Sequence, residues 1–434
     1  MESLAEVANN GVSSLTSSAD SLINTHGFRN LVVLGLVDVT KAPSISGFDS
    51  EGARITNEFN RQLQANLLGL PGRANLIWVD PNALLTRAIS NPSAFGITNA
   101  TDSAAPDAVS GVPSTLTEEE QAGYLFYDHI HPTTTFHQTL ATFVAHHLSF
   151  EVTAQDAHLL TDAALALDDR FGFEVTGLRK GQSRWNLNTS TYENKNGSRR
   201  RNTQSVRAEV DYGLTDNFLI GGEVVYTDGD SGHSDLATFG FGIDAALQGF
   251  FRSYQWELGV SAGTLSGDLE RDFDLGNLRA ESEQSAQVYT LHAALRNDRI
   301  TIANRPTFWE FGLKQRFVRR DRATESGAAS LNLHYNSDTL STTIANLEVG
   351  IELTPTVQVE LALNPVLAHS GGDFEVRQNN GFGAFSIHDG SGYDVHTARA
   401  TLKADLSKNT ILSLNLLGGS DDTWSAGLGI SLNF

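Results

Sequence analysis

The final stretch of the chain, WSAGLGISLNF (Trp424–Phe434), carries the period that decides the fold. Alternate positions hold Trp424, Ala426, Leu428, Ile430, Leu432 and Phe434, and the positions between them hold only Ser, Gly and Asn. Successive side chains of a β-strand point to opposite faces. The stretch therefore predicts a strand with one apolar face and one small, polar face.

The same period of two recurs from about residue 182 onward. It is clearest in residues 217–228, 356–364 and 397–406, and we count about twelve such segments. In residues 356–364 one face carries Val357, Val359, Leu361 and Leu363, and the other carries Gln358, Glu360, Ala362 and Asn364. In residues 397–406, alanine and leucine alternate in the same way with Arg399, Thr401, Lys403 and Asp405.

The connections between these segments are of two kinds. Short turns of similar sequence occur at residues 213–220, 352–359 and 405–412. Longer polar loops include TDGDSGHSD (227–235) and residues 370–392. Short turns at one end, long loops at the other and an even number of strands are typical of outer-membrane β-barrels. The last stretch also resembles the C-terminal signal of such barrels, with Phe434 as the terminal aromatic residue. The alternative is an ordinary half-buried strand of a soluble β-sandwich.

Residues 1–150 have a different period and predict an α/β domain. NLVVLGLVDV (30–39) and NLIWVD (75–80) are continuous apolar runs, which are typical of buried parallel strands. Helices are expected before residue 27, around residues 55–67, from Pro81, and over residues 133–148. Residues 91–123 read as one long loop of the kind that often has a function. This order predicts a three-layer sandwich around a parallel sheet.

Between the two parts, residues 151–171 predict a helix rich in Ala and Leu, roughly 30 Å long at 1.5 Å per residue. That length matches the hydrocarbon core of a bilayer, so the helix could fill the pore of a barrel. Its polar residues would then face lumen water or charged lumen side chains; they are Asp156, His158, Asp162, Asp168, Asp169 and Arg170. An ordinary linker helix is the alternative.

Composition narrows the classes of function. The formal net charge is −21, which argues against a nucleic-acid partner, because phosphate binding depends on clustered Lys and Arg. There is no Cys, which excludes disulfides and Cys-based metal sites, and we expect no cofactor. No apolar run of about 18 residues predicts a membrane-spanning helix, and the first residues show no signal-peptide pattern.

One loop carries candidate catalytic residues: YDHIHPT (Tyr127–Thr133) places Asp128 three residues before His131, with Pro132 suited to begin the closing helix. A passenger, a pore helix and a C-terminal barrel together resemble the autotransporters of Gram-negative bacteria. The passenger resembles the GDSL (SGNH) esterase family in YDHIHPT, in NLVVLGLVDVTKAP and in the ITNEFNRQLQANL helix. The resemblance implies that His131 is the general base of an ester hydrolase and that Asp128 orients its imidazole.

The resemblance is incomplete, because the Gly-Asp-Ser-Leu block that carries the nucleophile in this family has no counterpart here. Asp20-Ser21-Leu22 is a partial match, but it lies in a predicted helix, whereas the nucleophile needs an exposed turn between a strand and a helix. We therefore expect Ser21 to lie on a helix surface. The hypothesis is that the chain begins partway through the passenger and lacks the serine and oxyanion blocks.

The sequence thus predicts three parts: a partial esterase passenger (1–150), a linker helix in the barrel pore (151–171) and a twelve-stranded antiparallel β-barrel (172–434). Outer-membrane lipid, the barrel-assembly machinery and an ester substrate are the expected partners. The expected location is the bacterial outer membrane, with the passenger at the cell surface. Two other functions stay open: a non-enzymatic surface or adhesion protein with a degenerate passenger, and a plain channel.

Overall fold

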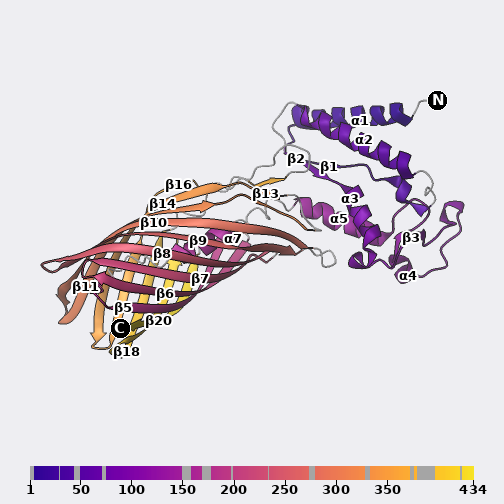
Figure 1. The fold of residues 1–434 in the computed structure, drawn as a ribbon. Coiled ribbons are helices and arrows are strands. Elements are labelled where there is room, and N and C mark those ends of the chain that lie inside the picture. The colour runs from indigo at the N-terminus through magenta and orange to yellow at the C-terminus, as the bar shows by residue number, and fades with distance from the viewer. Residues whose placement is uncertain are drawn as a thin grey trace.

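The fold is taken from a computed structural model of the chain (Figure 1). It describes residues 4–28, 30–43, 49–70, 75–148, 158–168, 177–196, 199–232, 234–272, 279–327, 333–371, 376–378, 396–420 and 423–434. Two regions are evident: a helix-rich N-terminal region and a β-barrel that ends the chain (Figure 1).

The barrel wall is an antiparallel sheet of long strands. They are β5 (Ser183–Asn196), β6 (Arg199–Thr215), β7 (Phe218–Asp230), β8 (Ser234–Phe251), β9 (Tyr254–Asp272), β10 (Arg279–Ile302), β11 (Arg305–Arg320), β14 (Asp338–Thr354), β15 (Val357–Asn364), β16 (Val366–Ser370), β18 (Thr397–Ser407), β19 (Thr410–Gly419) and β20 (Trp424–Asn433). Three short strands lie in the connections: β12 (Ala323–Thr324), β13 (Leu333–Tyr335) and β17 (Val376–Gln378).

The sheet closes on itself with twelve strands, as the alternating segments predict. β20 pairs antiparallel with β5, and β11 pairs with β14 across the gap left by the short β12 and β13. β15 and β16 both pair with β14 and together form one strand, which is interrupted at Pro365. The interruption follows from proline chemistry, because Pro365 has no N–H to donate to the ladder.

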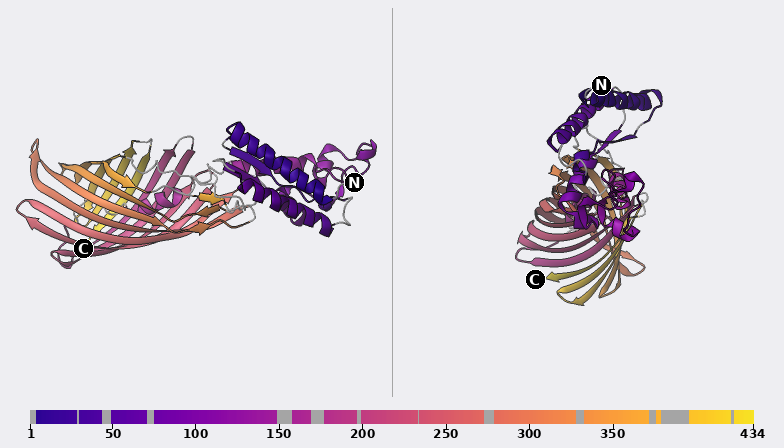
Figure 2. Two further views of the ribbon diagram at one scale, coloured as in Figure 1. Left: turned by 90° about the horizontal axis from the view of Figure 1, so that it is seen from above. Right: turned by 90° about the vertical axis from the view of Figure 1, so that its right-hand side faces the viewer.

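The two ends of the barrel differ in their connections. Five hairpins, β6–β7, β8–β9, β10–β11, β14–β15 and β18–β19, leave only two residues between their strands. Ala303 and Asn304 both have positive φ, 52° and 64°, which suits the tight turns that match strand twist. The N-terminal region lies beyond the opposite end, where the other connections are (Figures 1 and 2). One expectation is wrong here: most of TDGDSGHSD (227–235) belongs to β7 and β8, so that loop is short.

The barrel is apolar outside and mixed inside, as the alternation predicts. On β15, Leu361 and Leu363 are 60% and 57% exposed, whereas Glu360 and Ala362 are buried toward the lumen. The exposed apolar face of β20 carries Trp424, Leu428, Ile430 and Leu432, followed by Phe434 just beyond the strand. In a water-soluble barrel the apolar side chains point inward. Here they point outward, which suits contact with membrane lipid.

The N-terminal region is built from short elements. They are α1 (Leu4–Asp20), a π-helix (Ser21–Thr25), β1 (Asn30–Leu34), α2 (Asp49–Leu68), β2 (Asn75–Val79), α3 (Pro81–Ser90), β3 (Asn99–Ser103), α4 (Glu118–Ala122), β4 (Tyr124–Phe126) and α5 (Thr134–Leu148). Among the helices that the structure describes, none is long and apolar enough to cross a membrane.

Two helical layers enclose a parallel pair of strands, β1 and β2. Trp78 packs with α1 and α2 through Val12 and Leu63, whereas the next residue, Val79, packs with Leu84 of α3 and Phe136 of α5. Alternation along a strand explains why one strand contacts both layers.

Two expectations for this region need correction. The first predicted strand, residues 30–39, ends at Leu34, because the backbone N–H and C=O of Leu36 bond the side chain of Asn60 instead of a strand. Residues 91–123 are not one long loop, since they contain β3, α4 and two 3₁₀ turns, Pro92–Phe95 and Ala108–Ser110.

Candidate functional sites in the barrel lumen and on the loop before α5

Within the described part of the chain, one helix lies inside the barrel. α7 (His158–Asp168) packs against β6, β7, β8, β10 and β11, and its buried apolar side chains are Leu159, Leu160, Ala163, Ala164 and Leu167. These side chains form one apolar cluster with lumen residues such as Val225, Leu265 and Val288. The described helix is shorter than the predicted 151–171, and the flanking residues 151–157 and 169–171 lie outside the described ranges.

Gly263 of β9 allows the helix to approach the barrel wall closely. A Cβ atom at this position would lie 2.7 Å from Cδ2 of Leu167 and 3.1 Å from the carbonyl oxygen of Phe241. A larger residue at position 263 would therefore force the side chain of Leu167 to shift, so glycine here lets α7 pack closely on the wall.

A buried ion pair ties the helix to the wall. Nε of Arg201, on β6, donates to Oδ2 of Asp162 at 3.1 Å, and the side chains are 5% and 1% exposed. Asp162 thus faces a charged lumen residue, as the sequence predicts, and His158 is also buried. Asp156, Asp169 and Arg170 fall outside the described residues, and so does the side chain of Asp168.

The connection between β11 and β14 folds inward over the helix. Ala323, Leu333 and Tyr335, which belong to β12 and β13, join the same apolar cluster as α7. A buried ion pair between Arg271 of β9 and Glu325 holds this connection in place. β13 also pairs with β17, so two connections meet at this end of the pore. The lumen is therefore filled with apolar side chains on the side of the N-terminal region.

Toward the short turns the lumen is polar. A cavity of about 370 Å³ is bordered by ion-paired side chains, including Arg184 with Asp211 at 3.2 Å and Lys403 with Glu360 at 2.8 Å. Nearby, the carboxylates of Glu310 and Glu348 sit directly opposite each other on β11 and β14. Like charges in this position repel.

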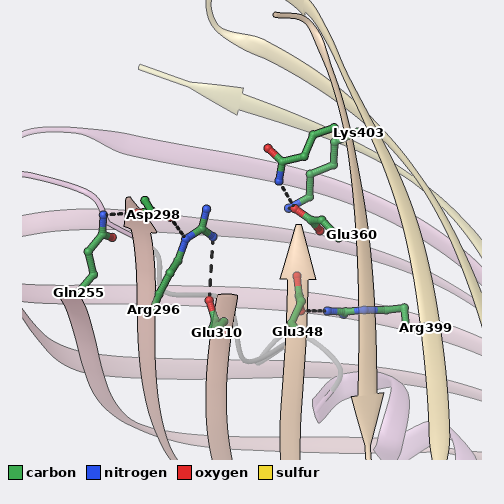
Figure 3. A network of polar contacts seen from close by, with 9 residues as sticks. Gln255, Arg296, Asp298, Glu310, Glu348, Glu360, Arg399 and Lys403 are labelled. Carbon is green, nitrogen blue, oxygen red and sulfur yellow. Dashed lines mark hydrogen bonds and ion pairs between the residues drawn. The ribbon is translucent and has the colours of Figure 1, made fainter. Parts of the chain in front are cut away.

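Arginines on β10 and on β18, which is separated from β14 by β15, offset that repulsion (Figure 3). Arg399 lies 2.8 Å from Glu348, and Arg296 lies 3.9 Å from Glu310. In the polar half of the lumen, these positive and negative side chains are therefore paired. Together they do not create a field of one sign.

Outside the barrel, the structure brings Asp128 and His131 together as the sequence predicts. Oδ2 of Asp128 lies 2.8 Å from Nδ1 of His131. Oδ1 of Asp128 accepts the backbone N–H groups of Ile130 and His131 at 2.8 Å and 2.7 Å. The carboxylate side chain is 9% exposed and the imidazole 70% exposed. A buried carboxylate thus holds one ring nitrogen and leaves the other side of the ring open to solvent.

Backbone bonds fix the loop that carries this pair. The N–H of Tyr127 donates to the carbonyl of His131 at 2.8 Å, which closes the turn around Asp128. The hydroxyl of Thr133 donates to the carbonyl of Tyr124 at 2.7 Å and accepts from the N–H of Phe136 at 3.4 Å. The helix therefore begins at Thr134 behind a threonine cap, and the expectation that Pro132 begins it is wrong.

Two serines, Ser21 and Ser103, bear on whether the site contains a nucleophile. Ser21 is the first residue of the π-helix that follows α1, so it lies in a helix as expected and not on a strand-to-helix turn. The hydroxyl of Ser103, at the end of β3, lies 3.3 Å from Nδ1 of His129. Sequence reasoning missed this second pair, because 26 residues separate its members. Within the described residues, no group of three or more His, Asp or Glu side chains is placed to hold a metal ion.

The pKa of Asp128 is lowered below its ordinary value. Burial of the carboxyl acts in the opposite direction, but the N–H groups of His131 and Ile130 and the imidazole of His131 outweigh it. A carboxyl whose folded pKa is lowered contributes stability above its unfolded pKa of about 4 and loses it as the pH falls through the folded value. The loop should therefore hold its structure at neutral pH and loosen in acid.

Asp128→Ala is expected to speed hydrogen exchange at the amides of Ile130 and His131 by about 10- to 150-fold at neutral pH, because lost hydrogen bonds to a charged group cost about 1.5–3 kcal/mol. Exchange measured by mass spectrometry over residues 124–137 checks this. Asp107→Ala is the matched control, since Asp107 is exposed on a nearby loop. Equal exchange in both variants would show that the carboxylate does not hold the loop.

Comparison with known proteins assigns the barrel to a family. Residues 180–417, more than half of the chain, match the model of the autotransporter beta-domain. The chain belongs to this family and is an outer-membrane protein. No curated protein matches the chain.

Solved structures with a similar fold include three autotransporter barrels. The translocator domain of NalP from Neisseria meningitidis is 11% identical, with a TM-score of 0.45, covering 66% of this chain and 96% of that one. The transport unit of AIDA-I from Escherichia coli is 10% identical, with a TM-score of 0.46 and coverages of 63% and 97%. The beta domain of the Bordetella autotransporter Brka is 15% identical, with a TM-score of 0.42 and coverages of 58% and 99%.

Membrane insertion gives a direct test of the outer face. Phe241 of β8 is 55% exposed in the apolar band, and Phe241→Arg is expected to weaken folding into phosphatidylcholine bilayers by about 2–4 kcal/mol. Asp235→Arg, on the same face but at the end of the strand, should cost only about 0–1 kcal/mol. Denaturant titration of both variants in vesicles measures the loss of folding free energy. Equal losses would mean that Phe241 does not lie deeper in the membrane than Asp235.

Proposed function

We propose that this outer-membrane autotransporter carries, in residues 1–150, part of an esterase passenger of the GDSL (SGNH) type. In this proposal residues 151–171 form the linker in the pore and residues 172–434 form the barrel. The observation that supports it most strongly is the 2.8 Å contact between Asp128 and Nδ1 of His131. A general base needs its far nitrogen free and its near nitrogen held by a carboxylate, which fixes the tautomer and stabilises the imidazolium.

The position of the pair also supports an active site. β1 and β2 run parallel, β3 and β4 run parallel, and Asp128 lies two residues beyond the end of β4. In α/β folds, ligands bind beyond the carboxyl ends of parallel strands. His131 would take the proton from a serine and later activate the water that releases the acyl group.

Residues 1–434 contain no Gly-Asp-Ser-Leu block, so we propose that they hold the base and its orienting carboxylate without the nucleophile. Purified and refolded, the chain should not turn over a short p-nitrophenyl ester above the background rate, and Ser21→Ala should change nothing. Loss of measurable turnover in Ser21→Ala would contradict this assignment.

Mapping the start of the transcript would then decide whether a Gly-Asp-Ser sequence lies in frame before Met1. If it does, the extended protein should hydrolyse the ester, and His131→Ala should lower kcat by about 10³-fold or more. Full activity of His131→Ala in that protein would refute the role of His131 as base.

The second candidate is a non-enzymatic surface or adhesion autotransporter with a degenerate passenger. The helical setting of Ser21 favours it, because that serine cannot act from a strand-to-helix turn. In either case we propose that the outward-facing row ending at Phe434 is recognised by the barrel-assembly machinery. The passenger would lie at the cell surface.

A further inference from the structure

We propose that a groove on the outer face of the barrel, over β18 and β19, binds one acyl chain of a membrane lipid. The acyl chain would enter from the leaflet on the side of the N-terminal region and stay bound when bulk lipid is removed. The proposal concerns the barrel wall and does not depend on the esterase proposal.

The groove has a volume of about 960 Å³, within the range of about 300–1,000 Å³ that is typical of small-molecule sites. Two neighbouring rows of outward-facing residues line it, and the strand register places the members of each row side by side around the barrel. The first row consists of Phe311, Leu347, Leu363, Ala398, Gly418 and Trp424. The second row consists of Trp309, Val349, Leu361, Ala400 and Leu416.

Differences in side-chain size give the groove its floor and walls. In the first row, the small residues Ala398 and Gly418 are paired with each other on β18 and β19. Leu363 of β15 lies on one side of them and Trp424 of β20 on the other. Ala400, the next outward-facing residue of β18, extends the floor. A Cβ atom on Gly418 would have no other atom within 4 Å, so the space above the floor is open.

The groove is closed at one end by leucines and has polar groups at the other. The next outward-facing residues toward the short turns are Leu402 and Leu414, which are paired and 43% and 45% exposed. At the other end, the N–H of Ser420 donates to the carbonyl of His396. Nδ1 of His396 accepts the N–H of Val366 at 3.1 Å, so a neutral ring carries its hydrogen on Nε2 and can donate it to a lipid ester carbonyl. An acyl chain would therefore enter beside His396 and end at the two leucines.

Membrane lipid is the occupant because the groove opens on the lipid-facing surface of an outer-membrane protein. The charged residues Glu348 and Arg399 also border the groove, but they pair with each other on the lumen side. Lipid tails are about as apolar as leucine, so hydrophobic burial alone does not hold one acyl chain at this place. In the groove, however, an acyl chain gains van der Waals contacts with the floor and both walls, whereas on a flat face it gains them on one side.

Native mass spectrometry of the full chain tests the proposal. The protein is refolded in dimyristoylphosphatidylcholine vesicles, extracted into detergent and washed until bulk lipid is gone. We expect one lipid to remain on the parent protein. Ala398→Phe fills the groove, and the retained lipid should fall by about tenfold, which corresponds to about 1.4 kcal/mol of lost contact. Ala293→Phe is the matched control and should keep the lipid, because Ala293 lies on β10 between the outward-facing Leu291 and Leu295, away from the groove.

Two further variants separate loss of the groove from loss of the fold. Gly418→Phe should also release the lipid, and the open space above Gly418 admits the new side chain without a clash. Denaturant unfolding like that of the parent would show that each filled variant is intact. In detergent, a retained lipid with brominated acyl chains should quench tryptophan fluorescence. Trp424→Phe should remove most of this quenching, because Trp424 forms one wall.

Retention of lipid at the parent level in both Ala398→Phe and Gly418→Phe would overturn the proposal. So would a parent protein that keeps no lipid after washing. A lipid-free dimer that Ala398→Phe converts to a monomer would also overturn it, because the groove would then bind a second copy of the chain. None of these measurements involves ester hydrolysis, so the esterase proposal can fail while this one stands.

Discussion

Arg201→Met is expected to weaken the packing of α7 in the lumen by about 3–5 kcal/mol, because it leaves the buried carboxylate of Asp162 without its ionic partner. Denaturant unfolding in detergent measures the change, and protease access to residues 158–168 reports release of the helix. The double variant Asp162→Leu, Arg201→Met should recover most of the loss, since an apolar pair of similar volume removes both buried charges.

Arg279→Met supplies a matched control for that experiment. Arg279 pairs with Glu270 at 2.9 Å, but the two side chains are 56% and 45% exposed, and exposed pairs contribute only about 0–1 kcal/mol. If Arg201→Met proves as mild as Arg279→Met, the ion pair does not hold the helix.

Leu160→Asp is expected to open the pore. Leu160 is 1% exposed inside the apolar cluster, and burying a carboxylate there costs several kcal/mol, more than one short helix can offset by its other contacts. The helix should leave the wall, and single-channel recordings in planar bilayers should show long-lived open states that are rare in the parent protein.

Leu165→Asp tests whether that effect comes from burial. Leu165 belongs to the same helix but is only partly buried, so its carboxylate can reach water and conductance should rise far less. A closed pore in Leu160→Asp would contradict the view that the apolar cluster closes the lumen.

The barrel was predictable from sequence because lipid and lumen impose opposite demands on successive residues. That demand fixes Leu361 outside and Glu360 inside, and it is readable as a period of two. The period of two does not reveal a strand where that strand extends past the membrane. Asp228 and Asp230 belong to β7, yet neither face of that segment needs to be apolar, so the segment reads as a loop.

Other features depend on contacts that no local pattern records. The Asp162–Arg201 pair joins residues 39 apart in the chain, so its partner could not be named from the helix alone. The end of β1 was misplaced because the apolar run continues to Val39, while the backbone of Leu36 bonds a side chain from α2. The Asp128–His131 pair was predictable because a three-residue spacing lets one turn make the contact.

The position of α7 gives the barrel a mechanical role. α7 lies in the lumen on the side of the N-terminal region, and Leu178, whose carbonyl accepts from the side chain of Gln248, lies near the short turns where β5 begins. A force that pulls the N-terminal region away from the barrel would therefore act along the barrel axis (Figure 1). The leucine contacts and the Asp162–Arg201 pair then resist this force together, because it acts parallel to the interface between α7 and the wall. The contacts do not break one after another. Such an anchor should resist rupture far better than its equilibrium stability alone implies.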